Sequence, residues 1–554
     1  MYRKQFLEIL FIFFSSIIYS QNVISPLDIP LNISGTFGEL RNTHFHTGID
    51  IKTKGKQGLK VKSIKDGYVV WIRVNKGGYG KSIYIKHSDG TTSIYAHLKM
   101  FSNEIEEYVK KIQYQKKSYE IQNFPEVSKL NFNAGDLIGF TGNTGSSSGP
   151  HLHFEVRNSK TNNPINPIKI GLKIFDSIKP KIKGLYVYKV YEDGSYDFLK
   201  RISIRKISDG NYEASTIEYI GNLGIGINYY DQQDKTYSKN GAYSIDFNIN
   251  KQSVFNYKMD KISFDDKRDL KLLVDYENWY INKNKIQKLF THPKSRYSFI
   301  KKSSSEGVFT VLNSDSYIGS IKIEDFNGNR TEIKLKFEGA IKDSLMKISK
   351  NKLINPEYEY SFNKNGISVN FPKNSFYNPI NLEIKSKNDT LDLGKNIHPI
   401  NKSFEINYKI NSNDTVLNSK GFISKINKYG NPLYLKTKKE DNVWTVKASE
   451  LGKYTLSVDT ISPSVKPINF KKNQWISNLN FLKLKVKDDL SGIRSIKGSI
   501  NGRWVLFEHE PKNNIISYNF SDNSFPNGKH LLKIEVVDLI GNEYLFETIF
   551  FKKY

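Results

Sequence analysis

The chain contains no cysteine among its 554 residues, and this absence sets the first limits on its chemistry. It excludes disulfides, a thiol nucleophile, zinc–thiolate sites and a cysteine that could carry a lipid behind a leader segment. Long hydrophobic runs are also missing, because no segment after the N-terminal region approaches the roughly 18 apolar residues of a membrane-spanning helix. The folded parts must therefore rely on apolar cores and on any bound metal.

Acidic residues are scarce relative to basic ones: 56 Asp and Glu stand against 83 Lys and Arg, for a formal net charge of +27. Such a balance is typical of proteins that meet polyanions such as DNA, membrane surfaces or anionic wall polymer. No nucleic-acid motif is present, and the lysines are spread along the whole chain. We therefore expect no nucleic-acid partner, and an attraction to an anionic envelope stays open.

The length of 554 residues is too great for one core and predicts three or four domains. Alanine is rare, whereas tyrosine, phenylalanine, isoleucine, asparagine, serine and threonine are abundant, which favours β structure. The fold class predicted from composition is mainly β.

Residues 1–20 resemble a secretory signal peptide. Arg3 and Lys4 supply a positive start, residues 9–18 form an apolar centre, and a small residue, Ser20, precedes Gln21 at the expected cut. An uncleaved anchor is the alternative, but the apolar run is short for about 30 Å of hydrocarbon. We predict an exported protein, periplasmic or extracellular in the cell envelope, with no stable membrane span after cleavage.

Histidines gather in the first third of the chain. Six of the ten precede residue 160, and the remaining four show no ligand-like spacing. Five potential site residues fall in three short segments, which read His46-Thr47-Gly48-Ile49-Asp50, Tyr95-Ala96-His97-Leu98 and His151-Leu152-His153-Phe154. Any one of these histidines alone is more simply explained as a structural or surface residue.

His151 and His153 are two residues apart in a segment whose other positions are apolar. Side chains alternate faces along a strand, so both imidazoles are expected to point into one cleft. A strand with two solvent-facing histidines is the alternative. His46 and Asp50 are four apart, which aligns them on one face of a strand or helix, and Gly48 disfavours a long helix. The alternative there is an exposed turn.

His97 ends the alternating run from Thr92 and is expected at the edge of a sheet, facing the same cleft. Imidazole nitrogen and carboxylate oxygen are zinc ligands, and a catalytic zinc site typically has three protein ligands and one water. The three segments together thus predict a zinc hydrolase, with surplus histidines available for proton transfer.

The order of these motifs resembles the M23 metallopeptidases, the lysostaphin- and LytM-like enzymes. Phe37-Gly38-Glu39-Leu40-Arg41 before the first histidine and Gly142-Asn143-Thr144-Gly145 before the last pair strengthen the resemblance, which covers about residues 35–170. It implies a small antiparallel β domain with one Zn²⁺ in a groove. The implied metal ligands are His46, Asp50 and His153, and the implied catalytic histidines are His97 and His151.

The resemblance also implies a substrate: the peptide stems or cross-links of peptidoglycan, cut by a zinc-activated water. A peptidase acting on glycine-rich protein is an alternative. A second alternative is a non-catalytic envelope protein that binds or activates another, although all five site positions are filled here.

One departure from the family lies between the second and third motifs. Residues 99–133 form a long insertion, in which apolar residues spaced as in a helix from Ile105 to Ile112 and a capping pair, Asn103 and Glu106, predict a short amphipathic helix at the rim of the cleft. It either shapes the substrate groove or is a packed decoration. His44 and His87 are left over and are expected at the surface, although His44 could also support a ligand.

The rest of the chain predicts β modules that resemble immunoglobulin-like or fibronectin-like sandwiches. Asp176-Ser177-Ile178-Lys179-Pro180 and Asp459-Thr460-Ile461-Ser462-Pro463 each are expected to follow a strand, and Asp325 and Asp538 each begin an Asp-x-x-Gly-Asn hairpin turn. We predict a peptidase domain at 21–175, a β-sandwich module at 176–340, a β-rich module at 341–458 and an immunoglobulin-like module at 459–554. These modules serve as spacers, or contact glycan or an envelope protein.

Overall fold

The fold was analysed in a computed structural model, which describes residues 23–41, 44–301, 303, 305–340, 353–411 and 413–553. In these residues it contains 46 strands and only three α-helices, so the mainly β prediction is confirmed. No helix within the described ranges is long and apolar enough to cross a membrane. The predicted leader at residues 1–20 lies outside them.

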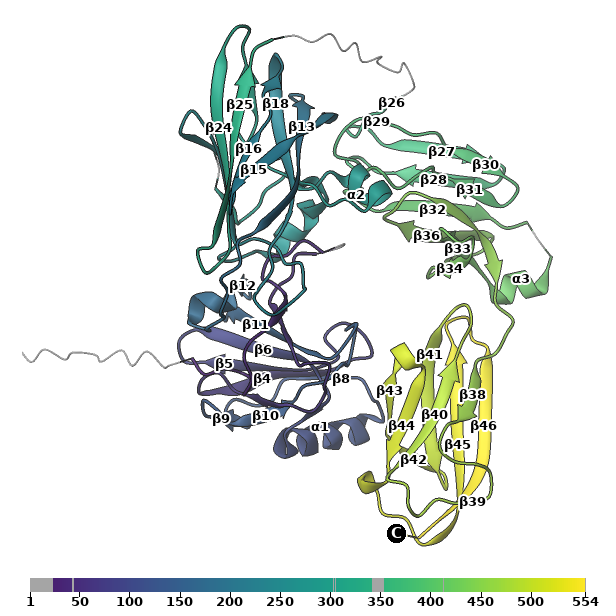
Figure 1. The fold of residues 1–554 in the computed structure, drawn as a ribbon. Helices are drawn as coiled ribbons and strands as arrows, with labels where there is room; N and C mark the ends of the chain where they lie inside the picture. Colours follow the sequence, from purple (N-terminus) through teal and green to yellow (C-terminus); the bar gives the residue numbers. More distant parts are fainter. Residues whose placement is uncertain are drawn as a thin grey trace, which may run out of the picture.

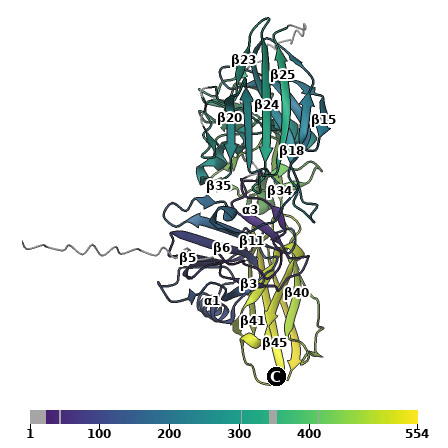
Figure 2. The ribbon, with the colours of Figure 1, turned by 60° about the vertical axis from the view of Figure 1, so that its left-hand side comes forward.

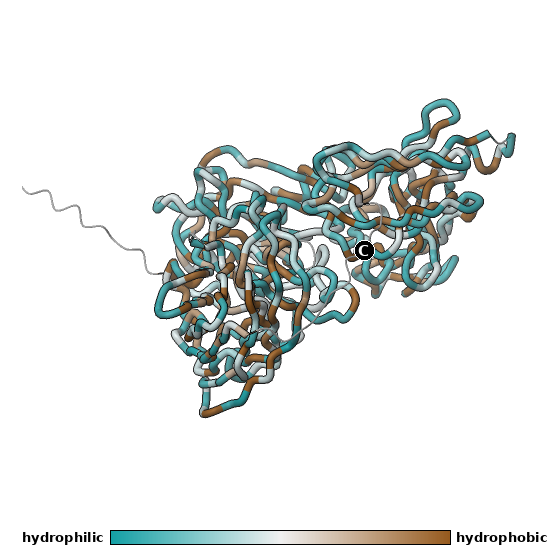
Figure 3. The backbone as a smooth tube through the Cα atoms, turned by 90° about the horizontal axis from the view of Figure 1, so that it is seen from above, coloured by the Kyte–Doolittle hydropathy of each residue, from teal (hydrophilic) through white to brown (hydrophobic). Residues whose placement is uncertain are grey.

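Four β modules follow one another along the chain (Figure 1). We name them the first (23–175), second (176–340), third (353–458) and fourth (459–553) modules. Short hydrophobic and hydrophilic stretches follow one another along the backbone (Figure 3), as expected for strands with one buried face.

The first module is built on a nine-stranded sheet with the main order β1-β2-β11-β6-β5-β4-β8, beside a smaller sheet β3-β10-β7. Its elements are β1 Ile33–Gly35, β2 Ile49–Lys52, β3 Lys60–Lys62, β4 Gly67–Val74, β5 Lys81–His87, β6 Thr91–Leu98, β7 Met100–Phe101, α1 Asn103–Lys116, β8 Ile121–Asn123, β9 Asn131–Phe132, β10 Leu137–Phe140, β11 His151–Asn158 and β12 Pro164–Ile165.

The second module contains two sheets, with main orders β14-β13-β18-β21 and β15-β16-β25-β24-β19-β20-β22. Its elements are β13 Lys181–Val190, β14 Tyr196–Ile202, β15 Ile204–Ser208, β16 Asn211–Ala214, β17 Ile217–Glu218, β18 Gly221–Tyr230, β19 Ser244–Ile249, β20 Gln252–Lys258, α2 Tyr276–Asn282, β21 Gln287–Lys288, β22 Ile300–Lys301, β23 Phe309–Val311, β24 Ser316–Glu324 and β25 Arg330–Glu338.

The third and fourth modules each contain two main sheets. These have the orders β27-β28-β32-β36-β35 and β30-β31-β37-β33-β34 in the third, and β38-β40-β44-β43 and β39-β46-β45-β41-β42 in the fourth. The third comprises β26 Leu353–Ile354, β27 Tyr360–Lys364, β28 Ile367–Phe371, β29 Ile380–Asn381, β30 Lys385–Lys387, β31 Thr390–Asp392, β32 Phe404–Lys409, α3 Thr415–Lys420, β33 Gly421–Ile426, β34 Pro432–Tyr434, β35 Lys438–Glu440, β36 Val443–Ala448 and β37 Lys453–Val458. The fourth comprises β38 Ser464–Pro467, β39 Gln474–Trp475, β40 Phe481–Lys487, β41 Ile493–Ile500, β42 Arg503–Val505, β43 Phe507–Glu510, β44 Ile515–Asn519, β45 Gly528–Asp538 and β46 Glu543–Lys552.

Both Asp-x-x-Gly-Asn segments are hairpin turns, as predicted. Glu324 pairs with Arg330 across the first, and Val537 pairs with Glu543 across the second. The two junctions differ from the prediction in one respect: Asp459 follows β37 directly, but Asp176 follows an irregular stretch and not a strand.

The buried cores show which modules depend on each other. One continuous cluster of buried apolar side chains runs from Leu27 to Phe337 and therefore spans the first and second modules. Phe45, for example, packs edge-on against Phe299, with ring centroids 5.0 Å apart. The third and fourth modules have clusters of their own.

The predicted amphipathic helix is α1, whose buried residues include Ile105 and Val109. Its N-cap is Ser102 and not Asn103, and Glu106 reaches back to the backbone N–H of Phe101 at 3.0 Å. The helix was therefore predicted correctly, but the capping pair of Asn103 and Glu106 was wrong, because the helix begins one residue earlier and Glu106 binds the backbone of Phe101.

The fourth module returns to the first and lies against α1 (Figure 2). Lys110 forms an ion pair with Asp522 at 2.6 Å, and Tyr114 packs edge-on against Trp504, with centroids 5.2 Å apart. Near them, buried Lys81 forms an ion pair with the half-exposed Glu508 at 2.9 Å. Burial lowers the pKa of Lys81, but the Glu508 carboxylate more than compensates, so the pKa is raised overall.

The Lys81–Glu508 pair predicts unequal effects of two substitutions. Glu508→Gln leaves the buried ammonium of Lys81 without its charged partner and should destabilise the docked state by about 1–3 kcal/mol. Lys81→Met keeps the buried aliphatic part of the side chain and leaves Glu508 exposed to water, so it should lower the stability of the docked state less. Urea unfolding of both variants measures this difference, and a larger loss for Lys81→Met would contradict the assignment.

Candidate metal centre

Strand register brings the predicted site residues together. In β11, His153 lies opposite Asp50 of β2 on one side and opposite Ala96 of β6 on the other. His151 lies two residues before His153 on the same face, as alternation predicted. Asp50 is on β2, whereas His46 precedes that strand in a loop, so the two are not on one regular element.

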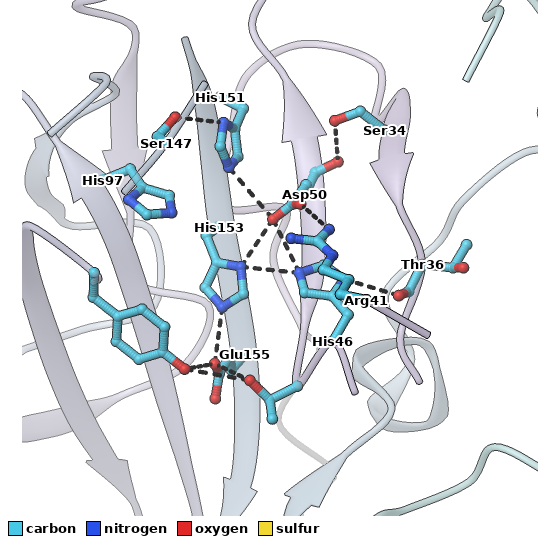
Figure 4. Close-up of polar contacts among 12 residues, drawn as sticks. Ser34, Thr36, Arg41, His46, Asp50, His97, Ser147, His151, His153 and Glu155 are labelled. Atoms are coloured by element: carbon cyan, nitrogen blue, oxygen red, sulfur yellow. Dashed lines mark hydrogen bonds and ion pairs between the residues drawn. The ribbon is translucent and has the colours of Figure 1, made fainter. Parts of the chain in front are cut away.

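Three ligand atoms converge at the centre of this group (Figure 4). His46 Nε2 is 3.1 Å from both Asp50 Oδ1 and His153 Nδ1, and His153 Nδ1 is 2.8 Å from Asp50 Oδ1. All three side chains are buried, with exposed fractions of 1%, 6% and 4%. The predicted metal-ligand set His46, Asp50 and His153 thus forms one compact group in space.

The opposite nitrogens of the two imidazoles have fixed partners. His46 Nδ1 lies 2.8 Å from the Thr36 carbonyl, and His153 Nε2 lies 2.8 Å from a Glu155 carboxylate oxygen. Because both partners can only accept, each of these nitrogens carries the proton. In the neutral rings, His46 Nε2 and His153 Nδ1 are therefore the atoms with a lone pair, and both face the Asp50 carboxylate, which is an arrangement that a cation between them would stabilise.

Asp50 divides its two oxygens between different partners. Oδ1 faces the histidines, whereas Oδ2 accepts a hydrogen bond from Arg41 at 2.5 Å. Burial raises the pKa of Asp50, but the charge of His46 and hydrogen bonds from the histidines lower it well below its usual value. Gly35 lies against this pair, and a Cβ there would come within 2.4 Å of the Arg41 guanidinium. A side chain at position 35 would therefore displace the arginine that orients Asp50.

The second pair of histidines lies beside the ligand group. The rings of His97 and His151 have centroids 4.8 Å apart, and His151 Nε2 lies 3.4 Å from Asp50 Oδ1. His97 Nδ1 faces the Thr144 carbonyl at 2.8 Å, and His151 Nδ1 faces the Gly149 carbonyl at 2.8 Å. These contacts fix Nδ1 of both rings on the backbone, and Nε2 of His151 is directed toward Asp50.

His97 differs from the prediction in its position within the sheet. Its strand, β6, lies between β11 and β5 in the interior of the sheet, and only the strand end places His97 at the site. The residue has a φ of 60°, in the left-handed region that non-glycine residues rarely adopt. Burial, followed by the nearby positive charges of His153 and His151, lowers the pKa of His97 to about 3.

Glu155, which is fully buried and holds His153, was not predicted from the sequence. Thr47 donates at 2.6 Å to Oε1, the oxygen that contacts His153, and the other oxygen, Oε2, pairs with Arg157 at 2.6 Å. The signal was present, because alternation along β11 places Glu155 on the same face as the two histidines. Burial raises the pKa of Glu155, but Arg157 and His153 outweigh it, so the carboxylate stays ionised.

The two leftover histidines have different positions. His44 is exposed, as expected. His87 is 2% exposed and lies 2.8 Å from both the Asp66 carbonyl and the Ser93 hydroxyl, so the expected surface position was wrong. It is a hydrogen-bonded core histidine.

Comparison with known families gives two matches. Residues 44–114 and 127–167 match the sequence model of Peptidase family M23, which includes all five site residues. Residues 351–459 match that of the Zu5-like domain.

Individual relatives match the first module. The DD-carboxypeptidase/endopeptidase Mpg of Neisseria meningitidis serogroup B is 34% identical over 154 residues, which are 27% of this chain and 29% of that protein. The glycyl-glycine endopeptidase ALE-1 of Staphylococcus capitis is 31% identical over 120 residues, 21% of this chain and 26% of that protein. The chain thus spans less than a third of the length of these relatives.

A solved structure covers the same region. The catalytic domain of lysostaphin from Staphylococcus simulans is 26% identical, covers 25% of this chain and 90% of that domain, and has a TM-score of 0.19.

The metal affinity of this group should rise with pH. Burial lowers the pKa of His153, but hydrogen bonds and charges of Asp50 and Glu155 raise it to about 9. Below that pH the metal-free protein holds a proton on His153 that metal binding must release. We expect the apparent affinity for zinc to increase about tenfold per pH unit between pH 6 and 8, measured by competition with a chelator.

The variant Glu155→Gln tests whether protonation of His153 causes this pH dependence. It removes the charge that helps to raise the pKa of His153, so the rise in affinity should level off at a lower pH than in the unaltered protein. An affinity independent of pH in both proteins would show that His153 is not protonated in the metal-free state.

Proposed function

We propose that the first module, which contains the residues that match Peptidase family M23, is a zinc metalloendopeptidase that hydrolyses peptide bonds in peptidoglycan stems or cross-links. The observation that carries the proposal is the convergence of His46 Nε2, Asp50 Oδ1 and His153 Nδ1 within 3.1 Å of one another. The names of the relatives support the substrate class, since one is a DD-carboxypeptidase/endopeptidase and the other a glycyl-glycine endopeptidase.

The donor set fits one Zn²⁺. Two imidazole nitrogens and one carboxylate oxygen are the usual ligands of a catalytic zinc, and their free lone pairs are directed by the Thr36 carbonyl and the Glu155 carboxylate. When bound, the metal supplies a water of lowered pKa and polarises the scissile carbonyl. Three protein ligands leave a fourth position for that water.

His97 and His151 are the proton-transfer groups in this proposal. Each holds its Nδ1 against a backbone carbonyl, which leaves Nε2 as the ring atom available for proton transfer. The lowered pKa keeps His97 neutral near pH 7, so its ring can accept a hydrogen bond or a proton there. We assign to this pair the acceptance of the water proton and its return to the leaving amine.

The protein would act outside the cytoplasm, in the periplasm or at the cell envelope, after removal of residues 1–20. The charged start and short apolar centre of that segment support export. In this proposal the second to fourth modules position the peptidase and contact glycan or an envelope protein, since the described part of the chain brings together no second histidine–carboxylate centre.

Peptidoglycan digestion tests the function directly. The unaltered protein should release new stem or cross-link cleavage products, which vanish with a chelator and return with added zinc. His153→Ala should lose both zinc and products, measured by metal analysis and by chromatography of the digest. His398→Ala, in the third module, is the matched control and should behave as the unaltered protein.

The outcomes separate the candidate functions. If the protein binds zinc and cleaves a glycine-rich protein but releases no peptidoglycan products, the substrate is glycine-rich protein and not peptidoglycan. If the protein holds no zinc and releases no products, the peptidase proposal is contradicted. An envelope protein that only binds or activates another protein is then favoured.

His97→Ala distinguishes a proton-transfer residue from a metal ligand. Because His97 lies outside the triangle of ligand atoms, the variant should keep one zinc per chain. Its kcat should fall by about 10²–10⁴-fold, the usual contribution of a general base. Loss of zinc in His97→Ala would instead make it a ligand, and an unchanged kcat would remove it from the reaction.

A further inference from the structure

Three carboxylates from distant segments meet where the first and second modules join. Asp176 lies in the junction, Asp231 directly follows β18, and Asp325 begins the turn between β24 and β25. One oxygen from each lies within 4.8 Å of the others. We call these residues the junction triad; Asp231 and Asp325 are each 4% exposed.

The junction triad has no basic counter-charge. Although the chain carries 83 lysines and arginines, none of them forms an ion pair with the triad within the described ranges. Burial, followed by the charges of Asp325 and Asp176, raises the pKa of Asp231 to about 8. The ionised form of Asp231 is therefore disfavoured without a cation, and a cation bound by the three carboxylates would stabilise it.

Two buried oxygens at this place lack hydrogen-bond donors: Asp231 Oδ1 and Asn240 Oδ1. Asp231 and Asn240 exchange backbone hydrogen bonds of 2.9 and 2.8 Å, and residues paired in this way project their side chains to the same face. Both side chains, together with those of Asp176 and Asp325, line a cavity of about 50 Å³. Asn240, which is also 4% exposed, thus offers a fourth oxygen to the cavity.

The fourth module contains a similar arrangement of three aspartates and one bridging asparagine. Asp459, Asp488 and Asp538 form a second cluster, in which Asn542 bridges Asp538 to the Asp459 carbonyl just as Asn329 bridges Asp325 to the Asp176 carbonyl. The third carboxylate differs, because Asp488 accepts backbone N–H groups from Leu490 and Gly492, at 3.2 and 2.6 Å.

We propose that the junction triad and Asn240 bind a hard divalent cation of the calcium type, at a site separate from the metal centre of the peptidase. The ligands would be oxygens of Asp176, Asp231, Asp325 and Asn240, with water completing the shell. A set made only of oxygens suits Ca²⁺ or Mg²⁺ and not zinc. Oxygens within 4.8 Å of one another can share one Ca²⁺, whose bonds are about 2.3–2.6 Å. Carboxylates from three separate segments suit the variable coordination of Ca²⁺ better than the strict octahedron that Mg²⁺ requires.

The cation would support the strand beside the peptidase centre. Gly241, next to Asn240, donates its backbone N–H to the Thr36 hydroxyl at 3.0 Å, and the Thr36 carbonyl orients His46. Gln233, two residues after Asp231, accepts the backbone N–H of Ile33 in β1 at 2.7 Å. The segment 231–241 thus connects the junction triad to the first strand of the peptidase sheet.

Calcium titration of the zinc-loaded full chain tests the proposal. Calorimetry should detect one binding event, and saturating Ca²⁺ should raise the first thermal transition by about 2–8 °C. Asp231→Asn keeps the side-chain shape and removes the carboxylate that would bind the cation. It should weaken calcium binding at least about tenfold and abolish the calcium-dependent shift.

Asp488→Asn is the matched control, since it changes the equivalent carboxylate of the other cluster and should leave the binding event and the shift intact. A titration with Mg²⁺ alone should give weaker binding than Ca²⁺. The proposal is overturned if neither cation binds the zinc-loaded protein, if Asp231→Asn binds calcium as the unaltered protein does, or if Asp488→Asn alone loses it.

Discussion

The antiparallel pairing of β2 with β11 is the constraint on which the site depends. It places Asp50 directly opposite His153, while pairing of β11 with β6 brings the end of β6, with His97, to the same face. A slip of one residue in this register would turn His151, His153 and Glu155 into the core and expose Leu152 and Phe154. The apolar alternation of β11 therefore secures both the fold and the orientation of the ligands.

The ligand geometry also requires a second layer of polar groups, which orient the metal-ligand side chains. A buried imidazole can direct either nitrogen inward, and the Thr36 carbonyl and the Glu155 carboxylate select opposite nitrogens for His46 and His153. Glu155 can remain ionised without solvent only because Arg157 pairs with it at 2.6 Å. The charge of the site is thus balanced through contacts that run from Arg157 through Glu155 to the metal ligand His153.

Sequence alone could predict the parts of this site that follow local periodicity. Alternation in His151–Phe154 and the motif spacing identified all five residues that the structure brings together, and the same alternation could have identified Glu155. Local pattern could not predict the loop position of His46 or the interior position of β6, because both depend on which strands pair across the sheet. The burial of His87 is of the same kind, since the Asp66 carbonyl and Ser93 that satisfy it come from neighbouring segments.

The peptidase motifs end near residue 167, but the core that supports them does not. Buried apolar contacts run without interruption from Leu27 to Phe337, and Gln233 of the second module accepts the backbone N–H of Ile33 at the start of the sheet. A fragment ending at residue 175 would expose Phe45 where Phe299 now covers it, and would leave Ile33 without this partner. Since exposed apolar area costs about 25 cal/mol per Å², such a fragment loses stability even if every ligand is present. The physical unit that holds the metal centre therefore consists of the first two modules, although the chemistry is confined to the first.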